Sequence, residues 1–141
     1  MRVSTLTGLV QIAGILHLGL LVAGGSMAKA VRFREQTAAL PPFLRQLFFV
    51  YMAFIGLVLA GFGLLTFFFA GEIARGEPLA RGLCFLFTVF WGLRLVVASF
   101  VFDVRPYLTT PLYRLGYWAT NAVFVYLLAV YAFASCRGGV L

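Results

Sequence analysis

The sequence predicts an all-α, polytopic membrane protein in which four transmembrane helices form an antiparallel bundle. Hydrophobic residues make up 63% of its 141 residues and charged residues 11%, whereas soluble domains are about 45–50% apolar and ~25% charged. Four apolar runs lie at about 6–24, 46–70, 83–102 and 117–136, and about 20 apolar residues are enough to cross the hydrocarbon core. All five prolines lie between these runs. We therefore expect a single transmembrane domain, residues 1–141.

The first run, 6–24, is predicted to be a retained helix rather than a cleaved signal peptide. A signal peptide has an apolar core of about 7–15 residues, whereas this run is longer and contains Gln11 and His17. The loop that follows, 25–45, is the most basic stretch of the chain. It ends in Leu40-Pro41-Pro42, which stops an earlier helix and allows the next one to begin in its first turn.

Two further loops separate the remaining spans. Residues 71–81, between the second and third runs, are polar and contain glycine and proline, which predicts a loop. Residues 103–116 contain Pro106 and Pro111, which argue against one continuous helix from the third run into the fourth.

The basic residues predict an orientation in the membrane. Four spans place both termini on one side and the loops 25–45 and 103–116 on the other. These loops contain six Lys and Arg residues and the opposite side contains four, namely Lys29, Arg32, Arg34, Arg45, Arg105 and Arg114 against Arg2, Arg75, Arg81 and Arg137. Because cytoplasmic loops are enriched in Lys and Arg, we expect these two loops in the cytoplasm and both termini outside. The net charge of +7 is then a membrane-surface signal, and no nucleic-acid partner is expected.

Arg94 is the main candidate functional residue because it lies near the middle of the third span. An arginine at that depth costs about 2.5–3.5 kcal/mol on insertion scales, and no acidic residue lies in the same span to neutralise it. One interpretation is an anion site for a lipid phosphate, a carboxylate or an acidic side chain of a partner. The alternatives are snorkelling of the side chain to the interface and cation–π packing on Trp91, three residues earlier.

Several other polar side chains are predicted at a similar depth. With a rise of about 1.5 Å per residue, His17, Asn121 and Tyr51 lie with Arg94 in the half of the membrane that faces the basic loops, whereas Gln11 lies in the other half. A shared depth is what an intramembrane polar pocket requires. The candidate ligand-binding residues of this pocket are Arg94, His17, Trp91, Asn121 and Tyr51. Asn121 and Gln11 are also suited to interhelical hydrogen bonding.

No catalytic or metal site is predicted. His17 is the only histidine, and Cys84 and Cys136 are expected at the opposite face, so a site with three or four protein ligands is not expected. His17 could still ligate a haem; the alternative is a packing or pocket-lining role. There is no Cys-x-x-Cys, His-Glu-x-x-His, phosphate-loop or serine-nucleophile motif, so catalytic residues stay unknown and no cofactor is expected.

Small residues and cysteines suggest helix contacts. Three small-xxx-small pairs favour close approach of helices, namely Gly19/Ala23, Gly56/Ala60 and Thr88/Gly92. Cys84 and Cys136 lie at helix ends that share a membrane face. They are either inert packing residues or, in a periplasmic location, a disulfide.

Several phrases resemble an uncharacterised family of short bacterial four-helix integral membrane proteins. They are Leu40-Pro-Pro-Phe-Leu-Arg45-Gln-Leu-Phe, Phe90-Trp91-Gly-Leu-Arg94-Leu, Phe102-Asp103-Val-Arg105-Pro106 and Gly116-Tyr117. The resemblance extends over most of the chain from the second span onward. It implies four helices and a bacterial plasma (inner) membrane, and it implies no activity.

A weaker similarity links the chain to the membrane-associated eicosanoid and glutathione metabolism family. It rests on Arg34-Glu35 and on Arg94 followed by Arg105-Pro106. The similarity implies four helices with outside termini and a glutathione site in a trimer. The acidic residue that this family carries on its second helix has no counterpart, because 46–70 contains no acid.

Taken together, these features favour a non-enzymatic binding or accessory protein. Its intramembrane polar pocket would hold an anionic amphiphile, such as an anionic lipid, or an acidic partner helix. The alternative is a small membrane enzyme that acts on a lipophilic substrate, with glutathione as a possible co-substrate, and a channel or transporter is the third interpretation. The expected partners are membrane lipid, another membrane protein or further copies of the chain.

Overall fold

The fold is all-α, with four long helices and three short ones. The computed structural model describes residues 2–137, and no strand occurs among them. The elements are α1 (Val3–Ala30), α2 (Phe33–Thr37), α3 (Pro42–Phe68), α4 (Ala70–Arg75), α5 (Pro78–Phe100), the 3₁₀ helix η1 (Arg105–Tyr107) and α6 (Pro111–Cys136). α1, α3, α5 and α6 are each long and apolar enough to cross a membrane. The prediction of an all-α, four-helix membrane protein is therefore confirmed.

Proline marks the start of three of the long helices. Pro42, Pro78 and Pro111 each lie in the first helical turn, where the missing N–H is harmless and the fixed φ suits a helix. The structure confirms that the second long helix begins at Pro42. It corrects the view of Pro111 as part of a loop, because the proline opens α6 and Thr110 Oγ1 accepts a hydrogen bond from the Tyr113 backbone N–H at 3.3 Å. The predicted runs cover only the apolar part of these helices, which begin several residues earlier.

The segment predicted as the loop 71–81 contains α4 and the first turn of α5. α4 ends at Gly76, whose φ of 75° requires the left-handed conformation that glycine adopts readily. Ile73 and Ala74 are buried against the long helices. Tertiary burial therefore stabilises a six-residue helix that its own sequence pattern does not predict.

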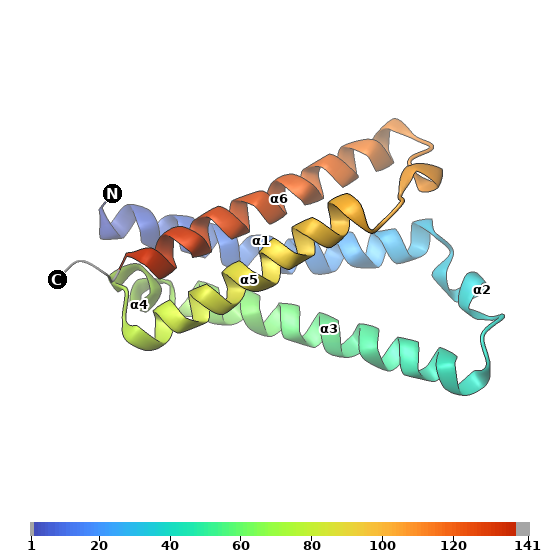
Figure 1. Cartoon of the computed structure of the whole chain (residues 1–141), viewed down its shortest axis with the longest axis horizontal. Helices are drawn as coiled ribbons and strands as arrows, with labels where there is room; N and C mark the ends of the chain where they lie inside the picture. The colour runs from blue at the N-terminus through green and yellow to red at the C-terminus, as the bar shows by residue number, and fades with distance from the viewer. Residues whose placement is uncertain (1, 138–141) are drawn as a thin grey trace.

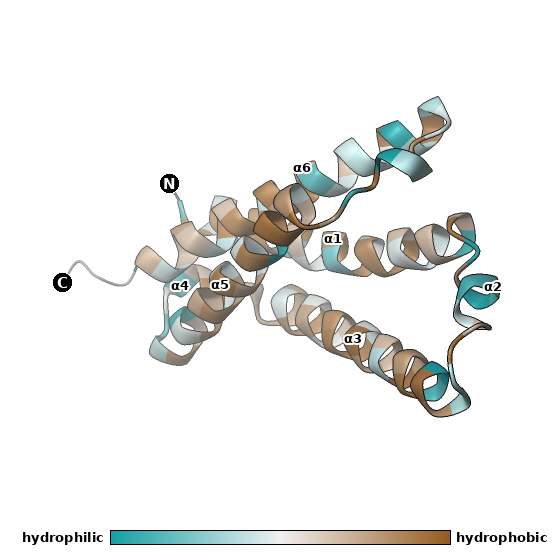
Figure 2. Cartoon of the chain, turned by 45° about the vertical axis from the view of Figure 1, so that its right-hand side comes forward, coloured by the Kyte–Doolittle hydropathy of each residue, from teal (hydrophilic) through white to brown (hydrophobic). Residues whose placement is uncertain are grey.

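The four long helices form two pairs, α1 with α3 and α5 with α6. The start of α1, the end of α6 and α4 lie at one end of the molecule, called the closed end here, and α2 and η1 lie at the other, called the open end (Figure 1). At the closed end α1 also contacts α4 and α6, and Tyr126 Oη donates to the Leu9 carbonyl at 2.9 Å. Toward the open end α1, α3 and the α5–α6 pair diverge (Figure 2).

The hydrophobic core follows this division and lies mostly at the closed end. Its members are Leu6, Val10, Ala13 and Leu20 of α1, Ala70, Ile73 and Ala74 of α4, Cys84, Phe87, Trp91 and Ala98 of α5, and Phe124, Leu127, Val130, Tyr131 and Ala134 of α6. From α3, only Gly63 and Thr66 are buried. In lipid, exposing an apolar helix face has no free-energy cost. Van der Waals packing, rather than the hydrophobic effect, therefore determines which helix faces contact one another.

α1 and α3 cross most closely at Gly14 and Gly63, which are not among the predicted small-residue pairs. A Cβ on Gly14 would lie 2.9 Å from the Gly63 carbonyl oxygen, and one on Gly63 would lie 3.0 Å from the Gly14 carbonyl oxygen. At Gly19 a Cβ would meet nothing within 4 Å. The closest backbone approach therefore occurs where no small-xxx-small spacing is present.

Both cysteines are free thiols, so no disulfide joins them. Cys84 is buried in the core near the start of α5, and Cys136 is exposed at the end of α6.

Candidate functional site

His17 forms the centre of a buried polar network at the level where the four long helices meet. Its side chain is completely buried, and its Nε2 accepts a hydrogen bond from Trp91 Nε1–H at 3.1 Å. Because an indole N–H can only donate, Nε2 carries no proton. The proton is therefore on Nδ1, which donates to the Ala13 carbonyl at 2.9 Å. The imidazole is neutral and its two nitrogens are both engaged.

The network continues to the other two long helices. Tyr131 Oη lies 3.4 Å from His17 Nδ1 and 2.8 Å from Thr66 Oγ1. The rings of Phe62 and Phe87 lie around the imidazole at 6.4 and 6.2 Å between centroids. Each long helix thus supplies one polar side chain: His17 from α1, Thr66 from α3, Trp91 from α5 and Tyr131 from α6.

The polar groups of these side chains are hydrogen-bonded to one another, so the network links the four long helices. Among residues 2–137 no group of three or more His, Cys, Asp or Glu side chains could hold a metal ion. Thr66 and Tyr131 were not singled out from the sequence. The available signal was that both are polar groups within apolar spans, since such groups need a partner in a medium without water.

Arg94 lies outside this network. Its side chain is exposed, and its guanidinium carbon lies 5.5 Å from the ring centroid of Phe102 and 5.6 Å from that of Phe124. The aromatic partners are therefore these two phenylalanines, whereas Trp91 stacks on Phe124 at 5.3 Å. Within the described part of the chain, no carboxylate lies within ion-pair distance of Arg94.

The structure places the other predicted pocket residues apart. Asn121 Nδ2 donates to the Tyr117 carbonyl of its own helix at 2.9 Å. Tyr51 is 60% exposed on α3. Of the five candidates, only His17 and Trp91 are in direct hydrogen-bonded contact, and Arg94 is linked to Trp91 through the ring of Phe124.

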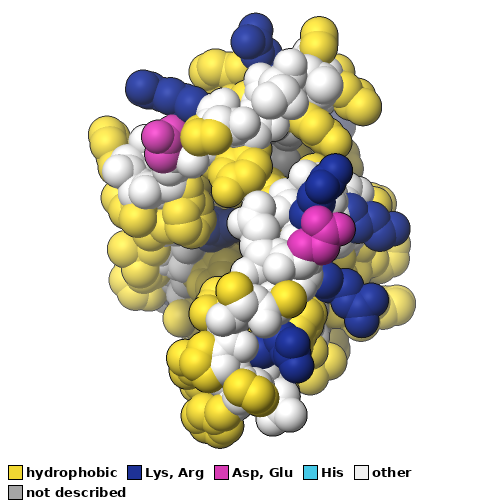
Figure 3. Space-filling model, turned by 90° about the vertical axis from the view of Figure 1, so that its right-hand side faces the viewer, with side chains coloured by type: hydrophobic (Ala, Val, Ile, Leu, Met, Phe, Trp, Pro, Cys, Tyr) yellow, Lys and Arg dark blue, Asp and Glu magenta, His cyan; other side chains and the backbone are white. Residues whose placement is uncertain are grey.

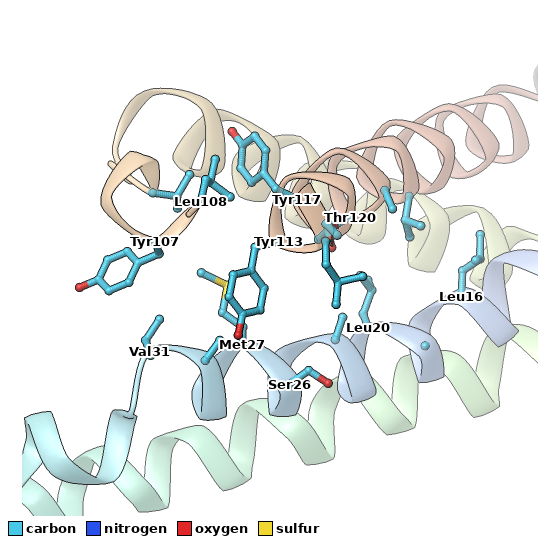
Figure 4. A pocket seen from close by; sticks show the side chains of 18 residues that line it. Leu16, Leu20, Ser26, Met27, Val31, Tyr107, Leu108, Tyr113, Tyr117 and Thr120 are labelled. Atoms are coloured by element: carbon cyan, nitrogen blue, oxygen red, sulfur yellow. Dashed lines mark hydrogen bonds between the residues drawn. The ribbon is translucent and has the colours of Figure 1, made fainter. Parts of the chain in front are cut away.

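A different space, an apolar cleft of about 550 Å³, lies between α1 and α6 in the open half of the molecule. Figure 4 shows Met27 of α1 and Tyr113 of α6 pointing toward one another across it. The cleft extends from Leu16 to Val31 along α1 and is lined from both helices and from the segment around η1 by Leu16, Gly19, Leu20, Ala23, Ser26, Met27, Ala30, Val31, Val104, Tyr107, Leu108, Leu112, Tyr113, Gly116, Tyr117, Ala119, Thr120 and Val123.

Two of the lining residues were expected to have another role. Gly19 and Ala23 were predicted to let helices approach, but they line the cleft, where their small side chains leave volume. Tyr107, Tyr113 and Tyr117 also line the cleft. A small residue on a helix can allow close contact with another helix or can leave an empty volume. The sequence contains no signal that distinguishes these two outcomes.

The open end is cationic. It contains six basic and two acidic side chains: Lys29, Arg32, Arg34, Arg45, Arg105 and Arg114 with Glu35 and Asp103. Glu35 pairs with Arg32 at 3.6 Å, and Asp103 Oδ1 accepts from the Arg105 backbone N–H at 3.2 Å. Figure 3 looks onto this end and shows the Lys and Arg side chains distributed around a surface that is otherwise largely hydrophobic.

Basic residues also flank the cleft lining along the chain. Lys29 lies between Met27 and Ala30, Arg105 follows Val104, and Arg114 follows Tyr113. An apolar cavity whose lining segments also carry basic residues matches a ligand that has one apolar and one anionic end.

The chain matches no protein-family model, no curated protein and no solved structure. Its all-α fold and its four apolar helices define it as a multi-pass membrane protein.

Proposed function

We propose that this protein is a non-enzymatic binding or accessory protein that holds an anionic amphiphile in the membrane. The apolar chain of the amphiphile occupies the cleft between α1 and α6, and its phosphate or carboxylate lies among the basic side chains of the open end. The observation that carries the proposal is the apolar cleft of about 550 Å³, whose lining segments also carry Lys29, Arg105 and Arg114. Its volume is within the range of about 300–1,000 Å³ typical of ligand pockets.

The chemistry of the lining supports an amphiphile rather than a polar solute. Leu16, Leu20 and Val123 form the inner part of the cleft, where an acyl chain gains apolar contacts. Tyr107 and Tyr113 combine an apolar ring with a hydroxyl group, a combination suited to the boundary between acyl chain and headgroup. No observation favours an enzyme or a channel over this binding role, and both stay predictions from the sequence.

Filling the cleft is expected to displace the amphiphile. Ala23→Trp and Ala119→Trp place an indole at two lining positions. Displacing as few as two methylenes at ~0.8 kcal/mol each lowers affinity by about tenfold. Native mass spectrometry of the protein with lysophosphatidylglycerol measures the bound fraction.

The matched control is Ala129→Trp, an exposed position on α6 that does not line the cleft. It should bind as the wild type does. Lys29→Gln combined with Arg105→Gln should remove the preference for lysophosphatidylglycerol over lysophosphatidylcholine without changing the binding of the latter. Equal binding by the Ala23, Ala119 and Ala129 variants would place the amphiphile elsewhere.

We also propose a bacterial plasma membrane location with the open end in the cytoplasm. The proposal rests on the resemblance to bacterial four-helix proteins and on six basic residues at that end against four at the other. A periplasm-active phosphatase fused to the C-terminus should be active. Green fluorescent protein, which fluoresces in the cytoplasm, should be dark at the same site. A fluorescent fusion with an inactive phosphatase would reverse the orientation, and activity of both would indicate dual insertion.

A further inference from the structure

Arg94 occupies the inward-facing stripe of α5. The buried residues of this helix are Cys84, Phe87, Trp91 and Ala98, a spacing that defines one face. Arg94 follows Trp91 by three positions and precedes Ala98 by four, so it lies on that same face. It is exposed, and toward the open end α1 and α3 diverge from the α5–α6 pair (Figure 2). An inward-facing cation is therefore left uncovered.

The guanidinium group lies between the middle of the bundle and the end of α5. Its carbon is 5.6 Å from the ring centroid of Phe124, which is close to the midpoint of the 26-residue α6, and 5.5 Å from that of Phe102, just beyond the end of α5. The chain contains four acidic residues, Glu35, Glu72, Glu77 and Asp103, and all of them lie outside the four long helices. A second copy of the chain therefore brings no carboxylate from within a span to this depth.

The space beside Arg94 has apolar walls. α3 and α5 meet where the ring of Phe62 packs on those of Phe87 and Phe90, at 4.4 and 5.6 Å between centroids. Beyond this contact α3 continues toward the open end with exposed apolar side chains, among them Ile55 and Val58. Val58 lies on the face of Phe62, one turn earlier. The space is thus bounded by an apolar helix on one side and by Arg94 on the other.

We propose that this space receives a transmembrane helix of a different protein, with an Asp or Glu at mid-membrane depth that pairs with Arg94. The inference is independent of the amphiphile cleft, which Arg94 does not line. A helix satisfies its own backbone polar groups in lipid and can present a carboxylate at any depth. A lipid phosphate stays at the interface, about 15 Å from the centre of a ~30 Å hydrocarbon core. Charge and depth together favour the helix.

The test uses designed apolar helices of 20 residues with Glu, Leu or Lys at the midpoint. Each is labelled for energy transfer and reconstituted with the full-length protein in phosphatidylcholine vesicles. The wild type should bind the Glu helix about tenfold more tightly than the Leu helix, because an unpaired charge in hydrocarbon is penalised on both partners. This comparison requires no variant.

Variants then locate the contact. Arg94→Leu should abolish the preference for the Glu helix. Arg94→Lys should keep part of this preference, because lysine retains the charge but lacks the planar fork of the guanidinium group. Arg94→Glu should bind the Lys helix more tightly than the Glu helix. Val58→Trp should weaken binding of the Glu helix. Leu57→Trp, an exposed position on another face of α3, should not. Trp91 emission, in a Trp118→Phe background, reports whether each variant retains the buried network.

Three results would overturn the proposal. The first is equal binding of the Glu and Leu helices by the wild type. The second is Arg94-dependent binding of phosphatidylglycerol without preference for the Glu helix, which would assign Arg94 to a lipid headgroup. The third is Arg94-dependent self-association of the protein in vesicles without any added helix, which would make a second copy the partner.

Discussion

Gly14→Ala and Gly63→Ala are each expected to destabilise the fold by about 1–3 kcal/mol, the usual cost of overpacking a tight interface. A Cβ on Gly14 would lie 2.9 Å from both the Gly63 carbonyl oxygen and the Phe67 backbone nitrogen. Backbone atoms cannot move aside as a flexible side chain does, so α1 and α3 must separate. Thermal unfolding in detergent micelles, followed by circular dichroism, measures the change.

The matched controls are Gly8→Ala on α1 and Gly61→Ala on α3. A Cβ at either position meets nothing within 4 Å, so only the helix propensity changes. Alanine is favoured there by about 0.5–1 kcal/mol, and the two controls should be neutral or stabilising. If Gly14→Ala were as stable as Gly8→Ala, the close crossing of α1 and α3 would be wrong.

Separation of α1 and α3 should also affect the buried network. Thr66 lies three residues after Gly63 on α3, and His17 lies three residues after Gly14 on α1. The crossing therefore determines how closely these two polar side chains approach Tyr131. A loss of stability in Gly14→Ala should be accompanied by a red shift of Trp91 emission, measured in a Trp118→Phe background.

His17→Leu is expected to cost about 1–3 kcal/mol, the penalty for leaving a buried donor without an acceptor. In this variant the Trp91 indole N–H loses the acceptor that lies 3.1 Å away, and no water is present in hydrocarbon to replace it. The contacts of His17 Nδ1 with the Ala13 carbonyl at 2.9 Å and with Tyr131 Oη at 3.4 Å are lost as well, whereas Tyr131 keeps its bond to Thr66 at 2.8 Å. Reversible unfolding in micelles or bicelles measures it.

A double-mutant cycle separates this bond from general packing. His17→Leu with Trp91→Phe should cost less than the sum of the two single variants, by about 0.6–1.7 kcal/mol, the range found for hydrogen bonds between membrane helices. Thr88→Val is the control, because its hydroxyl bonds only to the Cys84 carbonyl of its own helix. Additive effects of His17 and Trp91 would show that the two side chains are not coupled.

The arrangement of functions along the bundle follows from its division into two halves. The closed end holds the core and the His17 network, which make a rigid base. The open half contains the cleft and the exposed Arg94, and the helices diverge there (Figure 2). Rigidity at one end and open space at the other are suited to a protein that binds partners within the membrane.

The four spans could be predicted from the sequence alone, because a chain in lipid needs about 20 apolar residues per crossing and must satisfy its backbone hydrogen bonds internally. It also identified His17, Trp91 and Arg94 as polar groups within the apolar helices, and the mid-span depth of Arg94. These properties depend on one residue and its neighbours along the chain. α4 was missed because burial of Ile73 and Ala74 by other helices, rather than local periodicity, stabilises it.

Which of these polar groups contact one another depends on how the helices pack. The bond between His17 and Trp91 depends on the register of α1 against α5, and the exposure of Arg94 depends on the divergence of α3 from α5. From the sequence, Gly19 and Ala23 could lie at a helix contact or in a cleft, and in the structure both line the cleft between α1 and α6. Helix angles in lipid result from many weak packing contacts between distant residues, so no short stretch of sequence encodes them.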